Sequence, residues 1–441
     1  MNNQEHNGYV IFDDKSFGAK LYFSDEKIFL KIDVLETNFK EEVFPDQISL
    51  LNFQSSSGYF ALCNLYFIQS QCRLDLGSTY TFRVLWAFEN AHFQMQDDIR
   101  SDNWSVAIED FNQIQKLSGF KSHYHKNGWL WGYTPPPTIE LNCTHGNFIL
   151  EIAERFELEY KRKPKQVVFN FSYPAKLYFD HKVHFDDALK TVLSIRKFFS
   201  LLMGRVLNID GAYITLTDGD FQQQVNIYGF RKIQTSDKPL TPIIAFESPS
   251  ELEKLLDRWF EKIDKMDEAI TLHYQGLEQK DLAPQLRFQL FMQAIEGLHR
   301  RTVPSLAKPA DINHVVKILE QEKIAPEIVD KVEGILAHAH EPSLRQRLKY
   351  YWDLFSDEIT ALSPIFSKKT IQKLVATRNY YAHRLDKITQ VLTGKDLRNA
   401  TELVKAISHM AILTEIGVNI NGIGKTMKEK SFVNFIEPDK P

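Results

Sequence analysis

The hydrophobic period of this chain changes from mostly strand-like to helical across a segment that contains several prolines. Up to Tyr228, short apolar or alternating runs such as Tyr9–Phe12 and Phe60–Phe67 recur, and turn signals such as Asn127-Gly128 separate them. From Pro249 onward, apolar residues recur three and four positions apart, which is the period of an amphipathic helix. The sequence therefore predicts an α+β protein in which a β-rich part precedes an all-helical part.

These two patterns set the expected domains. Residues 1–235 are expected to form an N-terminal domain of sandwich-like antiparallel sheets, with one long helix over about Phe185–Met203. Residues 236–248, which include two prolines, are expected to be a linker. Residues 249–441 are expected to form a helical bundle, which includes shorter helices near Ile312–Gln321 and Pro326–Ala337 and another over about Leu344–Leu362. A chain of 441 residues is long enough for two or three such domains.

The composition excludes several classes of protein. With a net charge of -4 the chain is not a polycation, so any contact with nucleic acid needs a local basic patch. Cys63, Cys72 and Cys143 form no pair of metal-binding spacing, and no phosphate-binding glycine loop is present. We therefore expect neither a metal site nor a nucleotide cofactor. The chain shows no signal-peptide pattern and no apolar run of membrane-spanning length, so we expect a cytoplasmic location.

One short run in the helical part carries a candidate chemistry. The run Arg378-Asn379-Tyr380-Tyr381-Ala382-His383 places an arginine and a histidine with four residues between them. Histidine can transfer a proton near neutral pH, and arginine can hold a phosphate through two parallel hydrogen bonds. These two side chains are a minimal set for cutting RNA. As a bare spacing the motif is weak, because about one or two such pairs are expected by chance.

The position of Arg378 on its helix adds a second observation. In the helix that is expected to end at His383, Arg378 lies on the same stripe as the apolar Ile371. An arginine on an inward face needs an anion, a carboxylate or an aromatic surface as its partner. Glu296 lies beside the apolar stripe of an earlier helix and is the candidate carboxylate. A surface ion pair of Glu296 with Arg300, four residues on, is the equal alternative.

Helix geometry limits how the two motif side chains can meet. On an ideal helix Arg378 and His383 point about 140° apart, so one regular helix does not aim both at one phosphate. Either the helix is distorted near His383, or two copies of the motif meet across a twofold dimer interface. The alternative is that the charges form a solvated face and that His383 only meets the helix dipole. The flanking residues that would make a cleft basic, as RNA binding needs, are Lys368, Lys369, Lys373 and Arg384.

The residues of the helical half resemble a known family. An all-helical domain with Arg378, Asn379 and His383 at this spacing resembles the HEPN superfamily of ribonucleases, in which a polar residue often follows the motif arginine. Residues 293–301, Gln-Ala-Ile-Glu-Gly-Leu-His-Arg-Arg, resemble the helix that pairs with the motif helix in the ApeA-like branch. A β-rich half joined to such a domain is similar in architecture to this branch of anti-phage defence nucleases. The resemblance therefore covers the whole chain.

The resemblance implies a metal-independent endoribonuclease of an abortive-infection system that acts as a homodimer or a higher homo-oligomer. His383 would act as general acid or base, Arg378 would stabilise charge on the phosphate, and Asn379 would orient the phosphate or the histidine. The cut RNA, for which transfer RNA is one candidate, would carry a 2′,3′-cyclic phosphate and a 5′-hydroxyl. The N-terminal domain would sense a phage-derived trigger or restrain the nuclease.

Two alternatives from other functional classes remain open in the sequence. The helical part could be a non-catalytic dimeric scaffold or binding protein, with Arg378 serving only as a structural anchor. The N-terminal part could instead bind a carbohydrate or a peptide through Trp129, Trp131 and Tyr133, which alternate along one expected strand. An aromatic row of this kind is more often part of a core.

Overall fold

The computed structural model describes most of the chain and divides it into two units. The residues outside the description are 1–3, 25–26, 36–43, 74–76, 112–119, 126–127, 162–165, 234–241, 245, 247, 280, 305–311, 338–340, 384–389 and 437–441. Only the backbone is described for residues 73, 120–125, 128–132, 156–161, 166–172, 218, 312–313 and 337. Unit 1 comprises Met1–Asp257 and unit 2 comprises Arg258–Pro441.

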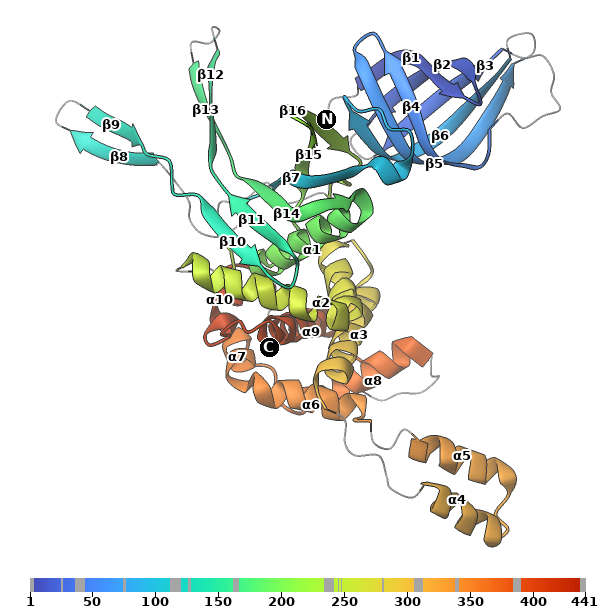
Figure 1. Ribbon diagram of the computed structural model, residues 1–441. Coiled ribbons are helices and arrows are strands. Elements are labelled where there is room, and N and C mark those ends of the chain that lie inside the picture. Colours follow the sequence, from blue (N-terminus) through green and yellow to red (C-terminus); the bar gives the residue numbers. More distant parts are fainter. Residues whose placement is uncertain are drawn as a thin grey trace. The chain divides into compact units, whose positions relative to one another are not determined.

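The first six strands of unit 1 close into a barrel (Figure 1). Neighbouring strands are antiparallel in the order β6-β3-β2-β1-β4-β5, and a further pairing of β5 with β6 completes the ring. Alternate side chains such as Leu21, Leu30 and Phe82 fill the interior and are fully buried. Closure gives every strand two neighbours and so leaves no exposed edge. The strands are β1 (Gln4–Phe12), β2 (Lys15–Phe23), β3 (Ile28–Val34), β4 (Gln47–Ser55), β5 (Gly58–Arg73) and β6 (Gly77–Glu89).

The same sheet continues from β6 through six more antiparallel strands. In pairing order they are β16 (Phe221–Tyr228), β15 (Ile209–Asp218), β7 (Arg100–Ile108), β14 (Pro174–His184), β11 (Phe148–Ile152) and β10 (Ile139–Cys143). The helix α1 (Phe185–Met203) contacts β7 and β14, and the ring of Phe185 stacks on Trp104 with 5.6 Å between centroids. Two further hairpins pair β8 (Phe120–His125) with β9 (Gly128–Tyr133), and β12 (Arg155–Lys161) with β13 (Gln166–Ser172).

Unit 2 is built from helices around a buried central one. The helix α9 (Gly394–Glu415) is buried along most of its length and packs against α3 (Pro284–Thr302). The motif helix α8 (Thr370–His383) contacts α3 and α6 (Leu344–Leu354). Within the described ranges, no helix is long and apolar enough to cross a membrane. The remaining helices are α2 (Pro249–Glu278), which begins in unit 1, α4 (Ile312–Gln321), α5 (Pro326–Ala337), α7 (Ser356–Leu362) and α10 (Ile423–Glu429).

The fold class predicted from the sequence is confirmed, with one helix assigned wrongly. The α+β order of a β-rich part and a helical part is present, and α1 occupies the predicted range. The single helix predicted over Leu344–Leu362 is wrong, because Phe355 leaves helical geometry with φ -113° and ψ 24°. After the break α7 contacts α10, where the carboxylate of Glu358 accepts the backbone N–H groups of Gly422 and Gly424 at 2.8 and 2.7 Å, so tertiary contacts decide the direction of the chain there. The linker over 236–248 stays a prediction, since much of it lies outside the described residues.

Candidate active site

The Arg–His motif lies on α8, and one face of this helix is fixed by burial. Its buried residues are Ile371, Leu374 and Thr377, which recur at helical spacing. The hydroxyl of Thr377 accepts the backbone N–H of Leu392 at 2.9 Å, which ties α8 to the segment that leads into α9. Arg378 follows directly after this anchor, so its backbone position is set by the packing of α8.

A carboxylate from a neighbouring helix holds Arg378. The Nη2 atom of Arg378 donates to Oε2 of Glu296 on α3 at 2.9 Å, and the two side chains are 23% and 22% exposed. The Nη1 atom donates to Oδ1 of Asn379 at a longer distance of 3.4 Å. A guanidinium has five N–H groups, so these two contacts leave donors for a phosphate. Arg378 is therefore oriented by the protein and still able to bind an anion.

Glu296 also connects to two other arginines. Its Oε1 atom lies 3.8 Å from Nη2 of Arg300, so the structure brings Glu296 to both partners that the sequence offered. Its backbone carbonyl accepts Nη1 of Arg347 on α6 at 3.0 Å. Glu341 lies 3.6 Å from Arg300 and 3.5 Å from Arg347. These contacts form a charged network that links α3, α6 and α8.

Sequence reasoning missed Arg347, which is the most buried member of this network. Its side chain is 3% exposed, and Nε donates to the carbonyl of Pro342 at 2.7 Å. Burial lowers the pKa of Arg347, and the positive charge of Arg300 lowers it further. Arg347 lies four residues before the buried Tyr351 on one helical stripe. The reasoning that singled out Arg378 would have found Arg347 as well.

His299 lies next to this network and is held in its neutral form. The residue is 4% exposed, and its ring meets the edges of Tyr350 and Tyr351 at centroid distances of 5.1 and 5.7 Å. Burial lowers the pKa of His299, and the nearby charge of Arg347 lowers it further. A neutral histidine beside Arg347 adds no second positive charge to the buried side of the network.

His383 lies at the exposed end of α8. It is the last residue of the helix, and residues 384–389 after it lie outside the description. The backbone remains α-helical through His383, so regular geometry separates it from Arg378 by about 140° around the axis. Asn379 precedes His383 by four residues and shares its side of the helix. A single copy of α8 therefore points Arg378 and His383 in different directions.

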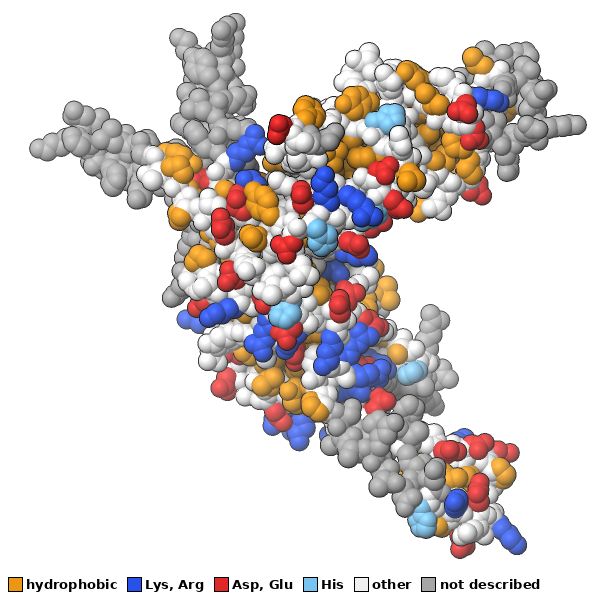
Figure 2. All heavy atoms as spheres, viewed as in Figure 1, with side chains coloured by type: hydrophobic (Ala, Val, Ile, Leu, Met, Phe, Trp, Pro, Cys, Tyr) orange, Lys and Arg blue, Asp and Glu red, His pale blue; other side chains and the backbone are white. Residues whose placement is uncertain are grey.

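The basic residues expected around the motif differ in whether an acidic side chain offsets their charge. The Nζ atom of Lys368 is 2.7 Å from Oδ1 of Asp353, so its charge is offset. Lys369 and Lys373 are exposed, and Arg384 lies outside the described residues. On the face shown in Figure 2, Lys and Arg side chains gather over α3 and α8, with acidic side chains among them. The basic character of this surface is therefore local.

A buried pair of histidines was not expected from the sequence. The Nδ1 atom of His273 lies 2.7 Å from the hydroxyl of Ser408, and its Nε2 atom lies 3.0 Å from Nδ1 of His409. Both histidines are fully buried. Burial lowers the pKa of His273 well below its ordinary value, and the charges of His409 and Lys405 act in the same direction. The pair joins α2 to α9 inside unit 2.

The other candidates from the sequence receive less structural definition. Trp129 and Trp131 lie on β9, but their side chains are outside the description. The hydroxyl of Tyr133 donates to Oε2 of Glu154 at 3.1 Å, and Tyr173 donates to Oε1 of the same carboxylate at 2.6 Å. Among the described residues, no three histidine, cysteine or acidic side chains are grouped to hold a metal ion.

The helical unit with an Arg–x4–His run at the exposed end of one helix has the features of a HEPN-type domain. Residues 290–421 match the family model of the Apea-like HEPN domain, and residues 5–264 match that of ApeA N-terminal domain 1. The chain therefore belongs to the ApeA family, whose members are HEPN proteins of anti-phage defence. No curated protein and no solved structure matches the chain.

Proposed function

We propose that this protein is an endoribonuclease that cuts RNA with Arg378 and His383 and without a metal ion. The observation that supports it most is the state of Arg378, which a carboxylate 2.9 Å away orients while other N–H groups remain available. An arginine with a purely structural role needs only its protein partner. Arg378 begins a HEPN-type motif and has further N–H groups that can donate, so it is suited to bind a phosphate.

The proposed reaction is an attack of the RNA on itself. His383 takes the proton of a 2′-hydroxyl, and the 2′-oxygen forms a bond to the adjacent phosphorus while the bond to the 5′-oxygen breaks. A proton is returned to the leaving 5′-oxygen, so the ends are a 2′,3′-cyclic phosphate and a 5′-hydroxyl. Arg378 stabilises the negative charge that builds on the phosphate, and Asn379 orients the phosphate or the histidine.

Two copies of the chain complete the proposed site. Because α8 is helical through His383, the two motif side chains of one copy diverge by about 140°. A twofold dimer that apposes two α8 helices brings Arg378 of one copy toward His383 of the other. The exposed Lys369 and Lys373 then add positive charge to the shared cleft.

The two halves have different roles in this proposal. Residues 249–441 form the nuclease domain, and residues 1–235 sense a phage-derived trigger or restrain cleavage. Family membership in anti-phage defence supports this division, because an indiscriminate ribonuclease harms its own cell. RNA is the substrate, and transfer RNA is the first one to examine.

The proposal is tested by mapping RNA ends with purified protein in EDTA. Wild-type protein should produce cyclic-phosphate and 5′-hydroxyl ends, and His383→Ala and Arg378→Ala should each lose this activity. His314→Ala is the matched control, because His314 is also an exposed histidine on a helix of unit 2. Cleavage by His383→Ala at the wild-type rate would disprove the assigned mechanism.

One observation favours a second candidate, a non-catalytic dimeric scaffold. The ion pair between Arg378 and Glu296 is also what a purely structural arginine would make. In that case phage protection should survive His383→Ala and fail in Arg378→Ala, with unfolding at lower temperature. For the nuclease, protection should fail in both variants while His383→Ala keeps the wild-type melting temperature.

A further inference from the structure

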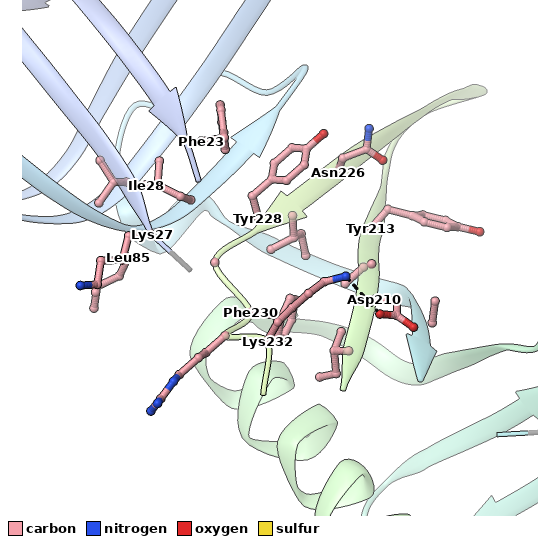
Figure 3. A pocket seen from close by; sticks show the side chains of 18 of the residues that line it. Phe23, Lys27, Ile28, Leu85, Asp210, Tyr213, Asn226, Tyr228, Phe230 and Lys232 are labelled. Atoms are coloured by element: carbon pink, nitrogen blue, oxygen red, sulfur yellow. Dashed lines mark hydrogen bonds and ion pairs between the residues drawn. The ribbon is translucent and has the colours of Figure 1, made fainter. Parts of the chain in front are cut away.

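A pocket of about 560 Å³ lies in unit 1, beside the join between the barrel and the rest of the sheet (Figure 3). Its walls come from the barrel strands β2, β3 and β6, from β7, β12, β14, β15 and β16, and from residues 229–232 after β16. A pocket of this volume is in the range that holds a small molecule rather than a folded partner. All of its lining residues belong to unit 1.

Small residues on neighbouring strands make the floor of this pocket. Ser105 on β7 lies opposite Tyr213 on β15, and Ala107 lies opposite Gly211, so the four residues share one face of the sheet. A Cβ atom built on Gly211 would meet nothing within 4 Å. Ser105 is 2% exposed, and its hydroxyl has no hydrogen-bond partner in the described part of the chain. The floor is therefore hollow and contains one polar group without a partner.

Aromatic rings stand around this hollow. Tyr228 and Phe23 both line the pocket, and their rings lie 5.1 Å apart. Phe230 also lines it, and its ring lies 5.1 Å from that of Trp86, which is not a lining residue. The hydroxyl of Tyr228 donates to Oε2 of Glu89 at 2.6 Å, and burial together with this bond raises its pKa. Tyr228 is therefore fixed in place and remains neutral. Such rings can stack on a planar aromatic ligand.

Positive charge dominates the described lining residues. They include five basic residues and one acidic residue, Asp210, which lies 3.3 Å from Lys232 (Figure 3). Arg83 and Arg231 are exposed and have no acidic partner among the described residues, so their guanidinium groups are available to an anion. The five basic residues are Lys27, Arg83, Arg155, Arg231 and Lys232.

We propose that this pocket binds a nucleotide. The base stacks against the aromatic wall at Tyr228 and Phe230, above the small residues of the floor, and the phosphate meets Arg83 and Arg231. An inorganic anion would use only the arginines, and a nucleoside would use only the rings. The site is separate from the cleavage motif, lies in the other unit, and contains no residue of the proposed nuclease.

Binding is measured by titration calorimetry on the full-length chain carrying Arg378→Ala, which removes a phosphate contact at the motif. The probes are the ribonucleoside 5′-monophosphates and 5′-triphosphates, with inorganic phosphate, pyrophosphate and adenosine as partial ligands. At least one nucleotide should bind at least about tenfold more tightly than every partial ligand. Failure of all nucleotides to bind, or equal affinity for pyrophosphate, would overturn the proposal.

Gly211→Leu tests whether the ligand occupies this pocket. The new side chain would enter open space, and Gly211 has no left-handed φ, so the fold should tolerate it. Nucleotide affinity should fall at least about tenfold. The matched control is Gly18→Leu, because Gly18 also lies in a strand of unit 1, has no left-handed φ and would meet nothing within 4 Å. Equal loss of affinity in both variants would contradict binding in this pocket.

A pair of charge variants tests the phosphate contact independently of the floor. Arg83→Gln/Arg231→Gln should weaken nucleotide binding at least about tenfold, because each guanidinium makes a charge-assisted contact. Lys20→Gln/Lys31→Gln removes the same two positive charges from exposed positions of the barrel outside the pocket. It should leave the affinity within about twofold. An unchanged affinity in the arginine variant would refute the phosphate contact.

Discussion

Subunits that carry Arg378→Ala and subunits that carry His383→Ala should restore activity to each other when they form a mixed dimer. In the proposed dimer each site takes its arginine from one copy and its histidine from the other, because α8 stays helical through His383. The mixed dimer then has one site with both substitutions and one site with neither. Two inactive proteins should combine into an active one.

The expected rate follows from the twofold geometry. A mixed dimer has one intact site of two, so it should cut RNA at about half of the wild-type rate. If Arg378 and His383 of the same copy form the site, both sites of the mixed dimer are damaged and its rate equals that of the parent variants. The shared site therefore predicts about half of the wild-type rate, whereas a site within one copy predicts only the rate of the inactive parent variants.

The assay uses differently tagged copies that are expressed together and purified through both tags. A mixed dimer of His314→Ala and His383→Ala subunits is the control, because it should keep about half of the wild-type activity in either arrangement. An inactive Arg378→Ala/His383→Ala dimer beside an active control would refute the shared site. Sedimentation of each parent variant as a dimer would show that its loss of activity is not caused by a failure to form the dimer.

Three further predictions concern the helical unit. A double-mutant cycle of Glu296→Gln and Arg378→Gln should give a coupling energy of about 1–2 kcal/mol. The quantity measured is the free energy of opening of α3 and α8, from hydrogen exchange, and effects that add within about 0.5 kcal/mol would contradict the prediction. Thr377→Val leaves the backbone N–H of Leu392 without its acceptor and should destabilise the unit by about 1–3 kcal/mol in urea unfolding, whereas Thr360→Val, at an exposed helical threonine, should cost much less. Because burial lowers the pKa of His273 and His299 below the unfolded value of about 6.5, the unfolded chain binds protons that the folded chain does not. Stability should therefore fall as the pH drops below about 6.5, by about 1.4 kcal/mol per pH unit for each histidine until its folded pKa is passed. The difference between the urea midpoints at pH 7.5 and pH 5.5 measures this loss. A pH dependence of the midpoint in His273→Gln that equals that of the wild type would count against the prediction.

Helices could be predicted from the sequence because their determinants are local. The predicted ranges of α1, α4 and α5 agree with the observed ones, since apolar spacing and flanking residues act within each segment. The closure of the barrel could not be predicted in this way. It depends on the pairing of β3 with β6 and of β1 with β4, which are separated by other strands in the chain. Alternation shows which face of a strand is buried and not which strand lies beside it.

The same division between local and distant determinants applies to the candidate site. The stripe that contains Arg378 was visible in the sequence, and it predicted that a partner such as a carboxylate was needed. From the sequence Arg378 and Arg300 were equal candidates for the partner of Glu296, and the packing of α3 against α8 was required to bring Arg378 within 2.9 Å. The His273–His409 pair joins residues 136 positions apart, so no local pattern could indicate it.

The contacts of Glu296 imply that three helices determine where Arg378 lies. Its carboxylate meets Arg378 on α8, and its backbone carbonyl accepts a hydrogen bond from Arg347 on α6. A buried guanidinium such as that of Arg347 has few alternative partners, so it holds this turn of α3 more firmly than an exposed residue could. Because an error of about 1 Å in a catalytic group can cost about 100-fold in rate, Arg347→Met should impair cleavage without touching RNA. The effect should appear as a lower kcat with a nearly unchanged KM, whereas a raised KM alone would place Arg347 in RNA binding instead.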